Sequence, residues 1–177
     1  MQQTHADASA QAITPEFDAL VAEMVDALMN QGITIGQVHG FTEEEYEAVY
    51  NLGFNQYNQG KFEEAARYFR FLTYYNHLEP RYAKALGACL QMLERYPDAI
   101  SAHTMALVMN AMDPEPMLRI AECLIAMGQL TDAAEMLDGV LKVCAEVGTH
   151  QAIQTRAAAL LSILAENGAV VAEEVPK

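Results

Sequence analysis

Three stretches of this chain repeat one pattern of large apolar, small and turn-forming positions at intervals of 34 residues. The first copy contains Leu52, Gly53, Gly60, Phe62 and Ala65. The equivalents are Leu86, Gly87, Glu94, Tyr96 and Ala99 in the second copy, and Ile120, Ala121, Gly128, Leu130 and Ala133 in the third. Agreement at several positions in one register predicts a helix, a tight turn and a second helix, three times over.

A pattern of this length resembles the tetratricopeptide repeat, a helix pair that stacks on its neighbours. Small residues such as Gly53 and Ala65 let two antiparallel helices approach closely, and one pair alone cannot bury its apolar face. We therefore predict an all-α fold, an α-α superhelix (solenoid) with a concave face made mainly by the first helix of each pair. The predicted repeats are 46–79, 80–113 and 114–147, within a repeat region of 42–147.

Helix-start signals support these boundaries. Thr42 is followed three residues later by Glu45, which is the spacing of a capping box. Pro80 and Pro114 open the second and third repeats at equivalent positions. The second repeat departs from the pattern in its turn, where Glu94 replaces glycine, and at His103, where a bulky apolar residue is expected.

The segments that flank the repeats differ in character. Residues 1–13 are predicted to be disordered, 14–41 to form a helix and a linker, 148–167 to form a helix that caps the open end of the stack, and 168–177 to form a tail. The N-terminal helix carries one apolar stripe of Phe17, Leu20, Val21, Met24, Val25 and Leu28. This stripe lies outside the repeat register, so it either packs against the first repeat or forms a contact between two copies in a homodimer.

The charge of the chain restricts its partners. The formal net charge is −14, and the first basic residue is Lys61. Nucleic acids and anionic membranes both require Lys and Arg, so neither is an expected partner. No apolar run reaches the roughly 20 residues needed to span a bilayer. The N-terminus lacks the features of a secretory signal, and we expect a protein of the cytoplasm.

The sequence contains no recognisable catalytic or metal-binding arrangement. It lacks the GxSxG, HExxH, Walker A and GxGxxG motifs, and its five histidines show no metal-ligand spacing. Cys89, Cys123 and Cys144 form no CxxC pair, and we expect them to be small buried thiols. The expectation is therefore a protein that is not an enzyme and that needs no cofactor and no metal.

An aromatic row on the first helix of the first repeat is the candidate binding site. Tyr50, Phe54 and Tyr57 follow helical spacing and avoid the packing positions, so they are predicted to face the concave side. The equivalent positions downstream are Lys84, Ala88 and Gln91, then Leu118, Glu122 and Ile125. An exposed aromatic row favours an apolar groove for a peptide, although the same side chains could instead pack on the N-terminal helix.

The segment LGFNQYNQGKFEEAARYFRFLTYYNHLEPRYAKALGACLQMLERYPDAI, together with AECLIAMGQLTDA, resembles the class II chaperones of type III secretion, the SycD/LcrH-like proteins. The resemblance covers roughly residues 15–165. It implies a bacterial cytoplasmic chaperone that holds an extended segment of a hydrophobic translocator in the concave groove before export, and that in many cases dimerises. It places Tyr50, Phe54, Tyr57, Phe62 and His77 at or near the groove, and it implies a motif with proline and leucine in the client.

Two other kinds of binding protein share the repeat pattern. A co-chaperone that clamps an acidic C-terminus would need Lys and Asn on the inner helices, where this chain has Tyr50, Phe54, Ala85 and Glu115, and only Arg119 fits. A generic tetratricopeptide scaffold or adaptor in a regulatory complex is the stronger alternative, because the repeat pattern alone does not distinguish it from a chaperone.

Overall fold

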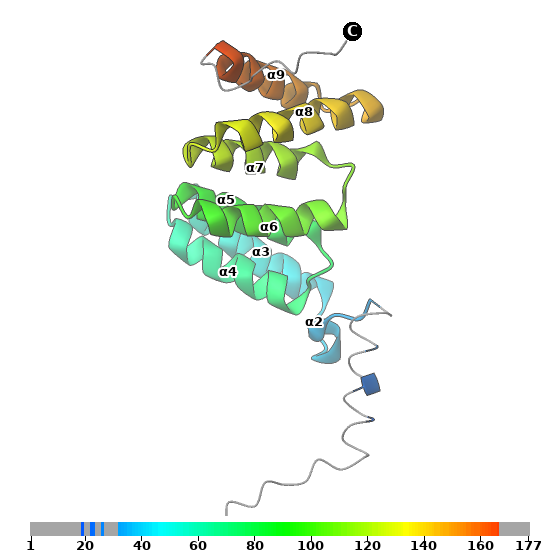
Figure 1. The fold of residues 1–177 in the computed structure, drawn as a ribbon. Coiled ribbons are helices and arrows are strands. Elements are labelled where there is room, and N and C mark those ends of the chain that lie inside the picture. Colours follow the sequence, from blue (N-terminus) through cyan, green and yellow to red (C-terminus); the bar gives the residue numbers. More distant parts are fainter. Residues whose placement is uncertain (1–18, 20–21, 24–25, 27–31, 167–177) are drawn as a thin grey trace, which may run out of the picture.

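The computed structural model describes residues 32–166 together with Ala19, Ala22, Glu23 and Asp26. Within residues 32–166 the fold is all-helical, as predicted (Figure 1). The helices are α2 (Ile35–Val38), α3 (Glu43–Asn58), α4 (Phe62–Tyr75), α5 (Pro80–Met92), α6 (Tyr96–Met109), α7 (Pro114–Ala126), α8 (Leu130–Val147) and α9 (Gln151–Glu166).

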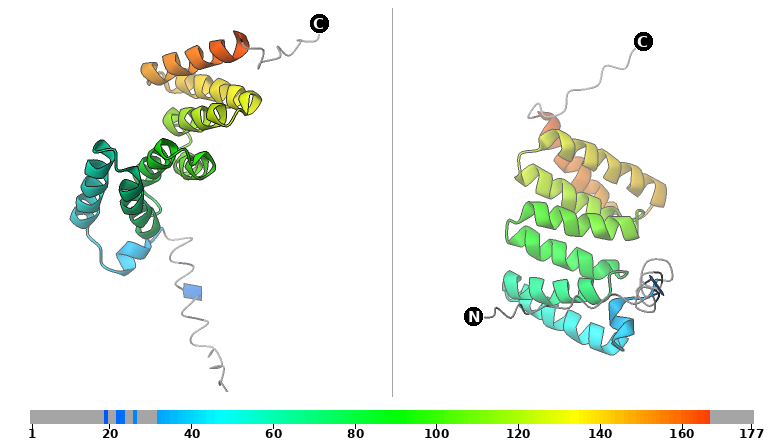
Figure 2. Two further views of the ribbon diagram at one scale, coloured as in Figure 1. Left: turned by 90° about the vertical axis from the view of Figure 1, so that its left-hand side faces the viewer. Right: turned by 60° about the horizontal axis from the view of Figure 1, so that its bottom comes forward.

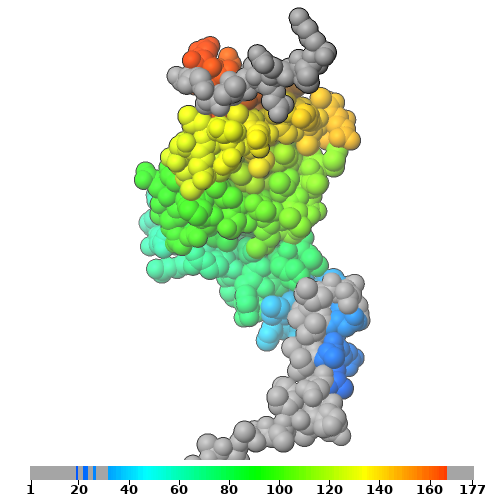
Figure 3. All heavy atoms as spheres, viewed as in Figure 1, coloured from blue at the N-terminus to red at the C-terminus, as the bar shows by residue number. Residues whose placement is uncertain are grey.

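Helices α3 to α8 form three antiparallel pairs, α3–α4, α5–α6 and α7–α8, and each helix packs on the next along the chain. Figure 2 shows that successive pairs are rotated relative to one another, so the stack is a curved superhelix. The first helices also approach each other, since α5 contacts α7 and α7 contacts α9. In the space-filling view the repeats form one continuous body (Figure 3). The predicted tetratricopeptide superhelix is therefore confirmed.

Local sequence signals fix where these helices begin. The Thr42 hydroxyl accepts a hydrogen bond from the Glu45 amide, and the Glu45 carboxylate accepts one from the Thr42 amide, so the predicted capping box is present. Pro80 and Pro114 occupy the first positions of α5 and α7. A second capping box, Thr34 with Gln37, begins the single turn of α2. This turn lies inside the segment that we expected to be only a linker.

The three turns within the pairs share one backbone conformation. Gly60 and Gly128 have φ angles of 76°, in the left-handed region, and Glu94 at the equivalent position has a φ of 58°. The replacement of glycine at Glu94 therefore leaves the turn geometry unchanged. The backbone of Glu94 is held in a conformation that L-residues adopt only at a cost in free energy.

Small residues sit where the paired helices meet. Ala65, Ala99 and Ala133 are completely buried, as their register predicts. Leu52 is the exception to the predicted packing, because its side chain is 49% exposed although Leu86 and Ile120 are buried. The reason is its place in the stack. The helix pairs that precede α5 and α7 cover Leu86 and Ile120, whereas no helix pair within the described residues precedes α3.

The two ends of the stack differ in what the structure describes. Helix α9 packs on α8 and buries Ala157 and Leu164 in the C-terminal core cluster. The predicted dimerisation set, Phe17, Leu20, Val21, Met24, Val25 and Leu28, lies outside the described residues. The same is true of the segments predicted to be disordered, 1–13, and to form a tail, 168–177.

Candidate functional site

A cavity of roughly 420 Å³ opens on the concave face between the first two repeats and reaches α7. Five residues of the predicted binding site line it. They come from α3 (Tyr50, Phe54, Tyr57) and α5 (Lys84, Ala88). Phe69 and Arg81 also line the cavity, although the sequence analysis did not predict them as site residues. Ala85, Glu115 and Arg119 line it as well, and the sequence analysis considered them only as positions of a clamp for an acidic peptide. The aromatic row of α3 therefore lines a cavity that it shares with residues of α5 and α7.

The three aromatic side chains of α3 differ in how much of their surface is free to contact a ligand. The Tyr50 ring lies 5.4 Å from the Phe69 ring and 5.9 Å from the Tyr82 ring, and it packs against the N-terminal core cluster. Phe54 is 48% exposed, and its ring is stacked parallel to that of Tyr50 at 6.5 Å. Within this row Phe54 therefore presents free apolar surface, whereas Tyr50 also supports the core.

The other residues of the predicted site lie outside this cavity. Phe62 meets the Tyr57 ring edge-on at 5.2 Å, just outside the cavity. The Gln91 amide donates a hydrogen bond to Glu122 at 3.3 Å, so these two residues are joined beyond Ala88. Leu118 is 4% exposed and belongs mainly to the C-terminal core, although it also borders a smaller cavity of about 180 Å³ on α7 and α9. His77 lies in the connection between α4 and α5 and is not among the residues that line either cavity.

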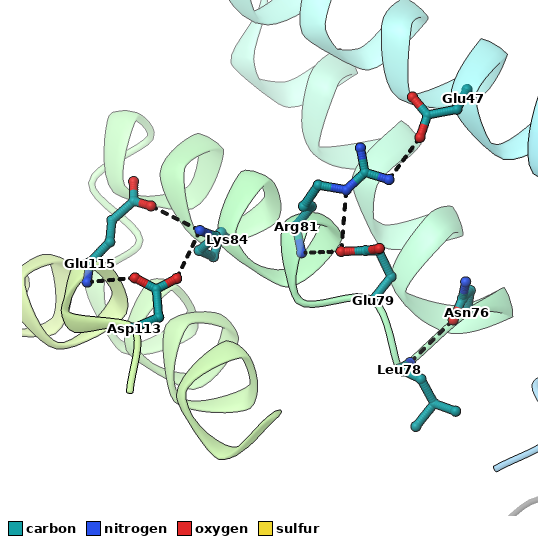
Figure 4. Close-up of polar contacts among 8 residues, drawn as sticks. All are labelled: Glu47, Asn76, Leu78, Glu79, Arg81, Lys84, Asp113 and Glu115. Carbon is teal, nitrogen blue, oxygen red and sulfur yellow. Dashed lines mark hydrogen bonds and ion pairs between the residues drawn. The ribbon is translucent and has the colours of Figure 1, made fainter. Parts of the chain in front are cut away.

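Ion pairs connect successive repeats along the concave face. The Arg81 guanidinium binds Glu47 of α3 at 2.7 Å, and the Lys84 ammonium binds Asp113 and Glu115 at 3.0 and 2.9 Å (Figure 4). Farther along, Arg119 binds Glu122 at 3.1 Å. Arg156 of α9 binds the same carboxylate at 2.5 Å. These contacts link α3 to α5, α5 to α7 and α7 to α9.

The carboxylates stabilise the charged forms of Arg81 and Lys84. The hydrogen bond that the Arg81 guanidinium donates to the Glu47 carboxylate raises the pKa of Arg81. Burial lowers the pKa of Lys84, but hydrogen bonds to Glu115 and Asp113 outweigh this effect and the pKa is raised. The basic groups that line the groove are therefore already matched by acidic groups of the same chain. An acidic peptide would have to displace these carboxylates, which argues against the clamp of an acidic C-terminus.

The sequence analysis missed these ion pairs, although the sequence carries a signal for two of them. Glu47 and Arg81 are 34 residues apart, and so are Glu122 and Arg156. In a repeat of that length, two such residues occupy equivalent positions on adjacent first helices. Opposite charges one repeat apart therefore predict a bridge between repeats.

The described residues provide neither a metal site nor a reactive cysteine. No group of three His, Cys, Asp or Glu side chains within them could hold a metal ion. All three cysteines are free and buried, as expected. Burial raises the pKa of the Cys89 thiol to about 12 and that of Cys123 to about 11, so neither is a reactive thiolate. None of the described helices is long and apolar enough to cross a bilayer.

Known proteins are similar to this chain in sequence and in fold. Family models described as tetratricopeptide repeats match residues 47–77 and 117–144. The low calcium response locus protein H of Yersinia pestis is 29% identical over 140 residues, which are 79% of this chain and 83% of that protein. The type III secretion translocator chaperone SycD of Yersinia enterocolitica has a solved structure that is 31% identical, with a TM-score of 0.70, over 73% of this chain and 97% of that one.

A third similar structure contains a bound partner. It is PcrH in complex with the chaperone binding region of PopD, and PcrH comes from Pseudomonas aeruginosa. It is 32% identical to this chain, with a TM-score of 0.69, over 73% of this chain and 97% of that one. The likeness extends from the sequence to the arrangement of the helices along nearly the whole length of these relatives.

Proposed function

We propose that this protein, which belongs to the tetratricopeptide-repeat chaperones of type III secretion translocators, binds hydrophobic translocator proteins before their export. It keeps them soluble by holding an extended segment of the client across its concave face. This is the role of a binding protein rather than of an enzyme, and its place is the bacterial cytoplasm, where translocators are made.

One observation carries the proposal about the site. Tyr50, Phe54 and Tyr57 of α3 line a single cavity with Lys84 and Ala88 of α5, and this cavity opens on the inner face of the superhelix. Aromatic side chains supply a large contact area with little loss of conformational entropy, and they dominate many interfaces. An apolar client side chain can enter beside Phe54.

The path of the client follows from the shape of the face. From the aromatic cavity the segment passes Ala88, where a small side chain leaves room, toward Gln91, Glu122 and the edge of Leu118. The paired charges of Arg81, Lys84 and Arg119 stand at the borders and can donate hydrogen bonds to peptide carbonyl groups. Small apolar anchors such as leucine or proline suit this groove, because the cavity is bounded and partly apolar.

The test is co-expression of the chain with the pore-forming translocators of a type III secretion system, followed by co-purification through a tag on the chain. We expect the translocators to remain soluble and to co-purify, and we expect translocators expressed alone to be insoluble. A generic scaffold would leave translocator solubility unchanged. Capture of a regulatory protein with no effect on any translocator would contradict the proposal.

A further inference from the structure

A second and larger cavity lies at the open end of the stack and not on the concave face. It measures roughly 630 Å³ and runs between α3 and α4. The residues that line it are Val49, Gln56, Lys61, Glu64, Arg67, Tyr68 and Phe71. Leu52, which is 49% exposed, lies between Val49 and Gln56 on the same side of α3.

In the other two repeats a helix covers this face. The positions equivalent to Val49, Leu52 and Gln56 are Ala83, Leu86 and Leu90 on α5, and all three are buried where α4 packs against them. On α7, Ile120 at the position of Leu52 is 4% exposed beside α6. The face of α3 is thus built like one that receives a helix. None of the helices in residues 32–166 covers it.

We propose that residues 17–28 of the same chain cover this face as an N-terminal capping helix. The apolar stripe of Phe17, Leu20, Val21, Met24, Val25 and Leu28 supplies the surface that α4 and α6 supply to the repeats after them. Terminal repeats of such stacks need a cap of this kind, and α9 fills that role at the other end.

Charge also favours this occupant. Residues 1–60 contain no Lys or Arg, and the segment around the stripe carries Glu16, Asp18, Glu23 and Asp26. The cavity presents Lys61 and Arg67 against one acidic residue, Glu64, so its rim has a net positive charge in a chain of net charge −14. An acidic amphipathic helix therefore matches both the apolar floor and the basic rim.

The attachment point and the length favour the chain's own segment over a second copy. The linker that follows the segment touches the rim of the cavity, because the Phe41 ring meets the Phe71 ring at 5.9 Å. A helix over residues 17–28 would be about 17 Å long, and the stretch of α4 from Phe62 to Phe71 is about 14 Å long. A segment tethered so closely has an effective concentration of order mM, which a second copy reaches only at high protein concentration.

The first test places a charge on the stripe of the full-length chain. Leu20→Glu should release the segment, so that hydrogen exchange of residues 17–28 and of the open face of α3 and α4 speeds up at least tenfold. The mass in light scattering should stay that of the wild type. Ala22→Glu is the matched control, because Ala22 is exposed and lies off the stripe, and its exchange should equal that of the wild type.

A second test stays informative if the first variant is only partly folded. A synthetic peptide of residues 14–31 should bind the Leu20→Glu protein at least tenfold more tightly than the wild type, in which the face is already covered. Equal binding to both proteins, or to neither, would overturn the proposal. So would a Leu20→Glu protein of half the wild-type mass, because the stripe would then join two copies, and so would equal effects of Ala22→Glu and Leu20→Glu.

Discussion

The imidazole ring of His103 on α6 lies directly against the backbone of Gly87 on α5. A Cβ atom added to Gly87 would lie 2.5 Å from Cε1 and 2.6 Å from Nε2 of His103. The same contact occurs in the first repeat, where a Cβ on Gly53 would lie 3.0 Å from two carbon atoms of the Phe69 ring. Both rings are one repeat apart, so His103 takes the place of an aromatic residue. A ring on the second helix requires a glycine on the first.

This contact predicts that Gly87→Ala destabilises the protein. Overpacking of a well-packed core costs about 1–3 kcal/mol, and the ring has no space to move because His103 is 1% exposed. In the His103→Ala background the same substitution should cost much less, because the added methyl group enters the cavity that the ring has left. Equilibrium unfolding in urea measures both values.

The matched control is Gly139→Ala on α8. A Cβ there would meet only the terminal methyl group of Met117 at 2.8 Å, and that side chain is flexible. Alanine also favours the helix over glycine by up to about 1 kcal/mol. We expect Gly139→Ala to be neutral or stabilising. Equal losses for Gly87→Ala in the presence and absence of the His103 ring would show that the two residues are not coupled.

The second prediction concerns acid stability. Burial lowers the pKa of His103 to about 4, and the nearby Arg119 adds to this effect. Neither ring nitrogen has a hydrogen-bond partner within the described residues. The folded state therefore holds the neutral form, and the unfolded chain binds the proton near pH 6.5. The stability that this group contributes is present above pH 6.5 and is lost as the pH falls toward 4.

The size of this loss follows from the two pKa values. Their difference corresponds to about 3 kcal/mol in full, of which about 2 kcal/mol is lost by pH 5. His103→Leu keeps a side chain of similar volume and cannot bind a proton. The difference in unfolding free energy between His103→Leu and the wild type should therefore grow by about 2 kcal/mol between pH 7.5 and pH 5. Parallel stability curves for the two proteins would contradict the prediction.

The third prediction concerns the turn at Glu94. Its φ of 58° lies in the left-handed region, where a side chain costs about 1–2 kcal/mol and glycine is free of this cost. Part of that gain is offset because glycine makes the unfolded chain more flexible. Glu94→Gly should raise the unfolding free energy by about 0.5–1 kcal/mol. Gly60→Ala, at the equivalent turn, should lower it. A Glu94→Gly protein that melts below the wild type would contradict this account.

The sequence predicted the architecture because the repeat imposes one register on many weak signals. Gly60 and Gly128 marked the turn within a repeat, and Pro80 and Pro114 marked the start of a repeat. Each kind of boundary was therefore marked in two of the three repeats. The left-handed conformation at Glu94 could be inferred only from its alignment with Gly60 and Gly128 in the repeat register, because nothing in the local sequence of the second repeat indicates it.

The candidate site was predictable only in part. The direction of Tyr50, Phe54 and Tyr57 follows from helical spacing, and the structure places all three around one cavity. The sequence could not predict that Tyr50 also packs against the core, because this packing depends on Phe69 and Tyr82, which lie on two other helices. Leu52 was misjudged for a related reason. A repeat pattern describes interior repeats, and no helix pair among the described residues precedes the first repeat to cover it.

The last prediction tests the groove through Phe54. Its ring is 48% exposed and lines the concave cavity, so it is free to contact a client segment. Anchors in bounded aromatic sites typically contribute about 2 kcal/mol or more, and Phe54→Ala should therefore weaken binding of a translocator segment about tenfold or more. The far-UV spectrum and the melting temperature should stay close to those of the wild type, because little buried surface is lost. Titration calorimetry and thermal melts measure the two effects separately.

Two further variants make the result specific to the concave face. Val108 is 80% exposed on α6 and is absent from the lining of the cavity, so Val108→Ala should change neither binding nor melting. Tyr50→Ala should lower both together, because the Tyr50 ring packs against Phe69 and Tyr82. If Phe54→Ala also lowers both, Phe54 belongs to the core rather than to the binding site. If it lowers neither, the client is held elsewhere, and the aromatic row of α3 is not what recognises it.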